Sequence, residues 1–190
     1  EKAYISEFGG SGAAWLDYDR DGELDLFLVN GLRGSGADPV AASIAGLAGQ
    51  SSGGGHALFR RRHDRYEPVT GAGGAGDHVW GNGAAVADLD NDGFPDLLVT
   101  AIGPDRLYRN NGDGTFSVWP AGVEDAGWGA SASFVDWDGD GWVDLYVAKY
   151  VDFDGTNTPT VGDRYCMYQG IDVFCGPEGL DGARDVFFRN

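Results

Sequence analysis

The sequence predicts an all-β fold built from repeated four-stranded units. Three observations support this prediction: an acidic loop occurs three times, short strands flank each copy, and a turn between aromatic-rich strands follows. Self-similarity of this kind indicates a repeat architecture, in which each unit buries its apolar face against its neighbours. We therefore expect residues 1–190 to form a single domain of stacked β-sheets.

The acidic loop has the pattern D-x-D-x-D-G-x-x-D, and its three copies occupy residues 17–25, 88–96 and 136–144. Alternate carboxylates on a tight turn repel one another unless protons or a cation neutralise them. Ca²⁺ accepts about six to eight oxygen ligands in a forgiving geometry, whereas Mg²⁺ requires a stricter octahedron. The pattern therefore predicts three calcium sites, one in each loop.

The ligands are predicted by analogy with the EF-hand loop, in which side chains alternate and a glycine makes the sharp turn. Positions 1, 3, 5 and 9 would supply carboxylates, and position 7 a backbone carbonyl. The predicted ligands are Asp17, Asp19, Asp21, Glu23 and Asp25 in the first loop, Asp88, Asp90, Asp92, Phe94 and Asp96 in the second, and Asp136, Asp138, Asp140, Trp142 and Asp144 in the third. A solvated acidic turn without metal is the alternative. A catalytic pair of acids is disfavoured, because catalysis needs one asymmetric site whereas structural metals recur in every repeat.

The strands around each loop follow one scheme. Small residues precede the loops at 10–16, 81–87 and 129–135, and apolar runs that are typical of strands covered on both faces follow at 26–29, 97–100 and 145–148. Aromatic segments come next at 56–60, 105–110 and 185–190, and the N-G-D-G turn at 111–114 predicts a hairpin. The second and third loops start 48 residues apart, at 88 and 136, which is close to the length of a β-propeller blade. The chain is therefore expected to hold about three blades.

Two insertions interrupt this scheme, at about 31–55 and about 151–183. The first is rich in Gly, Ala and Ser, and it predicts a short amphipathic helix that begins near Asp38-Pro39 and ends before Gly49. This helix would cap the rim or contact another chain. The second insertion carries Cys166 and Cys175, which are too few for a zinc site. A disulfide is favoured over two free thiols, and it would imply an oxidising compartment.

Charge and the remaining motifs exclude several functions. A net charge of −17 argues against nucleic acid or an anionic membrane as partner, and no apolar run is long enough to span a bilayer. The G-x-G-x-x-G stretch at 71–76 is interpreted as an inter-blade loop, because Pro68 interrupts the strand before it and no helix is expected after it. The arginines at 60–65 favour an ion-paired strand end over a phosphate site. The histidines lack metal-ligand spacing and are expected on the surface.

Four stretches are similar to FG-GAP or VCBS-type repeats, and most closely resemble the ASPIC/UnbV group, which includes the cartilage acidic protein. They are G-A-A-V-A-D-L-D-N-D-G-F-P-D-L-L-V-T, R-L-Y-R-N-N-G-D-G-T-F, Y-V-D-F-D and Y-C-M-Y-Q-G-I-D-V-F-C-G-P. The resemblance implies a calcium-stabilised β-propeller that is secreted, at the cell surface or periplasmic. It also implies a protein-interaction scaffold without enzymatic activity. Relatives carry more repeats, so we expect an incomplete propeller, either a fragment or a protomer completed by neighbours.

Two other functions compete with this interpretation. A carbohydrate-binding or carbohydrate-cleaving accessory propeller is suggested by tryptophans that could stack on sugar rings, although packing between blades is favoured for them. These tryptophans are Trp80, Trp119, Trp128, Trp137 and Trp142. The other alternative is a subunit of a larger or filamentous assembly, in which open strand edges pair across chains.

Overall fold

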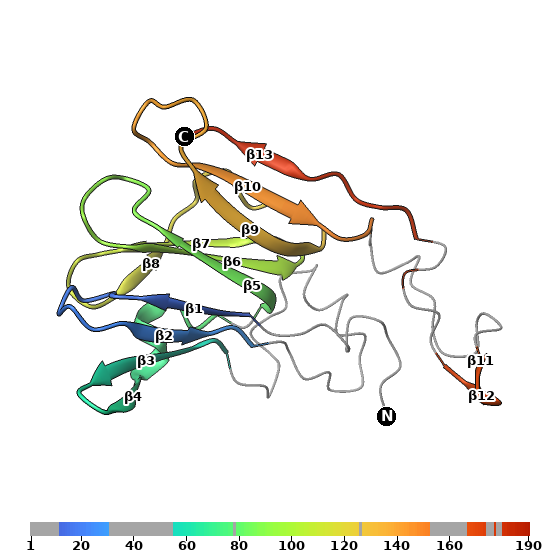
Figure 1. The fold of residues 1–190 in the computed structure, drawn as a ribbon, viewed down its shortest axis with the longest axis horizontal. Coiled ribbons are helices and arrows are strands. Elements are labelled where there is room, and N and C mark those ends of the chain that lie inside the picture. Colours follow the sequence, from blue (N-terminus) through green and yellow to red (C-terminus); the bar gives the residue numbers. More distant parts are fainter. Residues whose placement is uncertain are drawn as a thin grey trace.

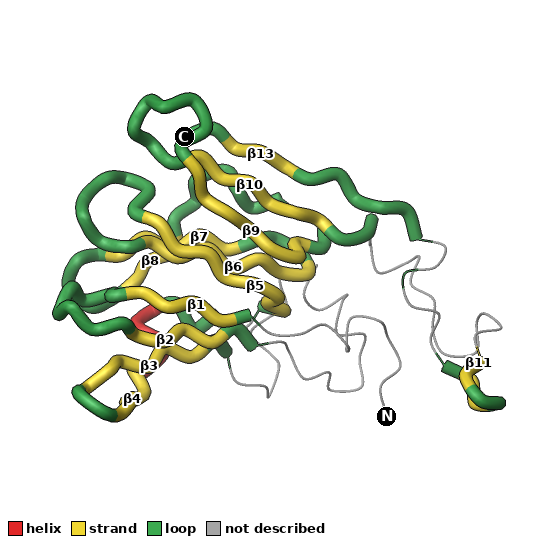
Figure 2. Tube along the Cα trace, in the orientation of Figure 1, coloured by secondary structure: helices red, strands yellow, loops and turns green. Residues whose placement is uncertain are grey.

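The computed structural model describes residues 12–30, 55–77, 79–125, 127–152, 167–173, 177 and 180–190. These residues form β-strands joined by loops, with one short 3₁₀ segment, η3, at Thr70–Gly74 (Figures 1 and 2). An all-β fold is therefore confirmed for the part of the chain that the structure describes. Among those residues there is no helix long and apolar enough to cross a membrane.

The strands form three stacked antiparallel sheets and one small hairpin. The first sheet has the order β1-β2-β3-β4, with strands Ala13–Leu16, Asp25–Leu28, Ala57–Arg62 and Arg65–Val69. The second has the order β5-β6-β7-β8, with Trp80–Ala87, Asp96–Ile102, Arg106–Asn110 and Phe116–Val118. The third has the order β13-β10-β9, with Val186–Phe188, Asp144–Lys149 and Gly129–Val135. The predicted four-stranded repeat is thus confirmed twice, and the third sheet has three strands among the described residues.

The hairpins agree with the turn chemistry of the sequence. The N-G-D-G turn joins β7 to β8, and its first residue, Asn111, donates its backbone N–H to the carbonyl of Thr115 at 2.9 Å. In the first sheet His63 and Asp64 join β3 to β4, and His63 adopts a positive φ of 57°. One expectation was wrong: Pro68 does not interrupt a strand but lies inside β4, paired with Phe59. Proline is tolerated there because β4 is an edge strand of its sheet.

The sheets stack face to face, with β1 against β5 and β5 against β9 (Figure 1). The strand β6 is buried along its whole length, as its apolar run predicts. Leu97 and Val99 belong to the core between the first and second sheets, whereas Leu98 belongs to the core between the second and third. The strand β6 therefore serves two interfaces, which is the packing expected of a propeller blade between two others.

Both predicted insertions fall between strands of one sheet, the first between β2 and β3 and the second between β10 and β13. The helix predicted after Asp38-Pro39 lies outside the described residues, and so do Cys166 and Cys175, so that the disulfide stays a prediction. Within the second insertion, β11 at Met167–Tyr168 pairs with β12 at Ile171–Asp172.

Candidate metal centres

The three acidic loops occupy equivalent places in the three sheets. Each begins directly after the first strand of its sheet, and its position 9 is the first residue of the second strand, at Asp25, Asp96 and Asp144. All three lie at the same end of the stacked sheets, on the left of Figure 1. The repeat in the sequence is therefore also a repeat in space.

Carboxylates converge in each loop. In the first two loops the residues at positions 1, 3 and 9 can each place one ligand atom so that all three atoms lie within 4.8 Å of one another. These residues are Asp17, Asp19 and Asp25, and Asp88, Asp90 and Asp96. In the third loop the corresponding group is Asp136, Asp138 and Asp140, so position 5 joins it and Asp144 does not. The structure thus brings together nine of the twelve predicted carboxylate ligands, and the other three, Asp21, Asp92 and Asp144, lie outside these groups. The backbone carbonyls of Glu23, Phe94 and Trp142 stay a prediction.

The aspartate at position 1 organises the turn through its own hydrogen bonds. Each of its two carboxylate oxygens accepts a backbone N–H, one from position 5 and one from position 6. For Asp88 the donors are Asp92 at 3.0 Å and Gly93 at 2.8 Å, and Asp17 and Asp136 accept the equivalent bonds. The glycine at position 6 has a positive φ in all three loops, 86°, 91° and 91°. This conformation explains why the sequence requires glycine there.

The aspartate at position 9 ties the loop to the third strand. The Asp96 side chain is fully buried, and its oxygens accept N–H groups from Leu89 at 2.9 Å and from Asn110, on β7, at 2.8 Å. The equivalent oxygens of Asp25 and Asp144 accept the same pair of bonds in their own sheets. Burial raises the pKa of Asp96 to about 6, and it also raises the pKa of Asp25. Position 9 is therefore a structural residue whether or not it binds a metal.

An arginine from the third strand reaches into each loop. Arg60 on β3 lies 2.6 Å from Asp19 and 2.9 Å from Asp21, which are the carboxylates at positions 3 and 5. Arg109 on β7 contacts Asp90 and Asp92 in the same way, and Arg189, directly after β13, contacts Asp138 and Asp140. The sequence predicts ion pairs for the arginines at 60–65, but it does not predict that one arginine enters each of the three loops. The available signal was an arginine at the same aligned position in all three aromatic segments.

The first loop retains acceptor capacity that its protein contacts do not use. Both carboxylate oxygens of Asp19 are buried; Oδ2 lies against the Arg60 guanidinium group at 2.6 Å, whereas Oδ1 has no hydrogen-bond partner among the residues that the structure describes. The loop carries five carboxylates, and the arginines within it or paired with it number three, Arg20, Arg60 and Arg61, so negative charge remains in excess. A donor set made only of oxygen atoms suits a hard divalent cation. The residues present therefore fit such an ion.

The histidine, the glycine-rich stretch and the tryptophans considered as possible binding residues have mostly structural roles. The surface position expected for the histidines is wrong for His56, which is buried and whose Nδ1 accepts the backbone N–H of Asn30 at 3.1 Å. The residues 71–76 form η3 and the connection from the first to the second sheet, as expected for an inter-blade loop. Among the five tryptophans considered for sugar stacking, Trp80 and Trp128 are buried and Trp119 packs against a core, whereas Trp137 and Trp142 are exposed.

Comparison with protein families supports the repeat. Residues 88–147, which run from the second acidic loop into β10, match the family described as FG-GAP-like repeat. A comparison with curated proteins found no match to this chain. The matched residues include the second and third acidic loops and the strands between them.

Proposed function

We propose that the chain forms part of a calcium-stabilised β-propeller that serves as a non-enzymatic scaffold for other protein chains. The observation that carries this proposal is the convergence of three carboxylates in each of the three loops, with positions 1 and 3 of the loop shared by all of them. The FG-GAP-like repeat over residues 88–147 supports a propeller-type module.

Calcium is the ion that we assign to the loops. Carboxylates at positions 1, 3 and 9 would bind it in the first two loops, with position 5 and the carbonyl of position 7 completing the set. A bound Ca²⁺ would hold the turn closed and would link metal binding to the free energy of folding. The chain's own hydrogen bonds at positions 1 and 9 already place the carboxylates, so the protein orients its ligands before the ion binds.

We further propose that the protein works outside the cytoplasm and belongs to the ASPIC/UnbV group. The predicted disulfide between Cys166 and Cys175 and the segment around it support both statements. Catalysis is not proposed for the loops, because the same carboxylate arrangement occurs three times and each copy is held by the strands of its own sheet. Binding of other chains is assigned to the surfaces of the sheets and to the insertions.

Metal analysis and thermal unfolding together test the metal assignment. Purified chain dialysed against calcium should retain up to three equivalents of Ca²⁺, one for each loop, and EDTA should lower its melting temperature. The variant Asp19→Asn should lose part of this response, because it alters a buried carboxylate whose Oδ1 has no hydrogen-bond partner among the described residues. Asp64→Asn, in the exposed turn between β3 and β4, is the matched control. An unchanged melting temperature with EDTA and no bound calcium would refute the assignment.

A further inference from the structure

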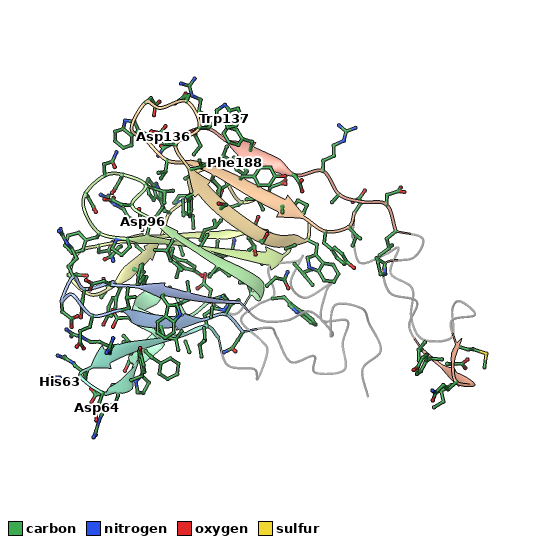
Figure 3. All side chains as sticks on the ribbon, viewed as in Figure 1. His63, Asp64, Asp96, Asp136, Trp137 and Phe188 are labelled. Carbon is green, nitrogen blue, oxygen red and sulfur yellow. The ribbon has the colours of Figure 1, made fainter. Side chains whose placement is uncertain are left out.

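The acidic loops of neighbouring sheets contact one another, and each contact starts from position 4 of a loop. This position lies between the carboxylates at positions 3 and 5, and it has a positive φ in all three loops, 56° at Arg20, 54° at Asn91 and 74° at Gly139. Asp96, at the end of the second loop, and Asp136, at the start of the third, lie at the same end of the stacked sheets (Figure 3). A side chain at position 4 can therefore reach the next loop.

Asn91 connects the second loop to the third. Its side-chain amide donates to the carbonyl of Gly141, the turn glycine at position 6, at 3.2 Å. The N–H of Gly141 donates to Asp136 at 3.0 Å, and the N–H of the next residue, Trp142, donates to Asp140 at 2.9 Å. The Asn91 amide therefore contacts the peptide that the third loop's own carboxylates hold in place.

Arg20 connects the first loop to the second at the equivalent place. Its guanidinium carbon lies 5.2 Å from the centroid of the Phe94 ring, and a Cβ at Gly93 would be only 2.8 Å from one of its nitrogens. Gly93 and Phe94 are positions 6 and 7 of the second loop, and the carbonyl of position 7 is a predicted ligand. Because position 4 of the third loop is Gly139, the side-chain contacts run from the first loop to the second and from the second to the third.

A second bridge fixes the spacing of neighbouring loops. The buried Asn110 amide donates to the carbonyl of Tyr18, position 2 of the first loop, at 2.8 Å, and to that of Pro95, position 8 of the second, at 3.2 Å. Asn190 makes the equivalent bonds between the second and third loops, at 2.8 Å and 3.3 Å. Positions 2 and 8 are not predicted ligands. This bridge therefore keeps the loops adjacent, and the contact that involves the ligand positions is the one from position 4.

We propose that the three metal sites bind calcium with positive cooperativity, because a loop that is ordered by its ion holds the next loop in the binding conformation. An ion shared by positions 3 and 5 would fix the backbone of position 4, and with it the Asn91 amide or the Arg20 guanidinium group. The next loop then loses less conformational entropy when its own ion binds. The coupling is reciprocal, and one exposed hydrogen bond corresponds to a factor of about 2 to 10 in affinity. The inference rests on the calcium assignment proposed above.

Calcium titration followed by NMR tests the proposal site by site. The backbone N–H groups of Gly22, Gly93 and Gly141 each donate to the position 1 carboxylate of their own loop, so each amide signal reports one site. Asp90→Asn weakens the second site, and it should raise the calcium concentration at the midpoint of the Gly141 signal by about 2- to 10-fold. In Asn91→Gly, which copies position 4 of the third loop, adding Asp90→Asn should leave this midpoint unchanged.

The matched control is Gln169→Gly, in the turn between β11 and β12, because Gln169 is also a non-glycine residue with a positive φ, 52°. In this variant the Gly141 midpoint should respond to Asp90→Asn as it does in the wild type. The contact between the first and second loops gives an independent test if Asn91→Gly does not fold. There Arg20→Gly is combined with Asp19→Asn, and the midpoint is read from the Gly93 signal.

Three outcomes would overturn the cooperativity and leave the calcium assignment standing. A Gly141 midpoint that Asp90→Asn does not change would show that the sites are independent. A lower midpoint would show that repulsion between neighbouring ions dominates. An equal shift with and without Asn91→Gly would assign the coupling to other contacts. Glycine signals that do not respond to calcium at all would instead refute the calcium assignment, and this inference with it, so the two failures are distinguishable.

Discussion

Lys149 and Asp105 form a buried ion pair, with the ammonium nitrogen 3.0 Å from a carboxylate oxygen, and this pair joins the third sheet to the second. Asp105 also accepts the backbone N–H of Ala101 at 2.9 Å. Burial raises the pKa of Asp105 to about 6, and the attraction of Lys149 only partly opposes this effect. The equivalent residues in the other sheets, His56 and Asp185, accept the same backbone bond, from Asn30 and Lys149.

The raised pKa of Asp105 predicts how stability depends on pH. Between the ordinary pKa of 3.8 and about 6 the folded chain holds this proton and the unfolded chain has released it. The contribution of Asp105 to the free energy of unfolding therefore falls as pH rises through this window, by about 3 kcal/mol. Urea denaturation of metal-free protein at a series of pH values measures the slope. Asp105→Asn should reduce the slope of the unfolding free energy against pH by about half, because the pKa of Asp96 is also raised and Asp96 supplies the rest. An unchanged slope in Asp105→Asn would show that Asp105 does not cause this pH dependence.

Asn110 is predicted to be the most important polar side chain between the first and second sheets. It is buried, it donates to the carbonyls of Tyr18 and Pro95, and its own oxygen accepts the N–H of Gly112. Asn110→Ala should lower the free energy of unfolding by about 2–4 kcal/mol, because buried partners lose their hydrogen bonds. Asn111→Ala, which removes exposed bonds next to it, should cost less than about 1 kcal/mol. Equal losses in the two variants, measured by urea denaturation, would count against this role.

Arg109 is predicted to stabilise the metal-free second loop and to weaken its affinity for a cation. Its guanidinium group lies against Asp90 and Asp92, so it both neutralises these carboxylates and repels a second positive charge. Arg109→Gln should lower the melting temperature in EDTA and increase the rise in melting temperature that calcium produces. Arg106→Gln, whose partner is Asp77 away from the loop, is the control. Weaker calcium binding in Arg109→Gln, measured by calorimetry, would show that the arginine assists the ion instead.

The sequence alone was sufficient for features that a short stretch of chain determines. The loop positions, the glycine turn and the N-G-D-G hairpin all depend on contacts within about five residues, and all are present in the structure. The contacts that the sequence did not predict depend on which strand pairs beside the second strand of a sheet and on which sheets stack. Arg109 and Asp90 are brought together only when β7 pairs with β6, and Asn110 meets Tyr18 only when two sheets stack. Pairing and stacking are not encoded in any local pattern.

Position 9 of the loop is predicted to differ from position 3 in its effect on metal-free stability. Asp96 accepts two backbone N–H groups while buried, so the amide of Asp96→Asn must turn its NH₂ toward one donor and leave that donor unpaired. We expect a loss of about 1–3 kcal/mol in EDTA. Asp90→Asn retains an acceptor for Asp92 and loses only a partly exposed ion pair, so its metal-free stability should change by less than about 1 kcal/mol. Both variants should respond less to calcium. Urea denaturation with and without calcium separates the two roles, and identical losses for both variants in EDTA would refute the distinction.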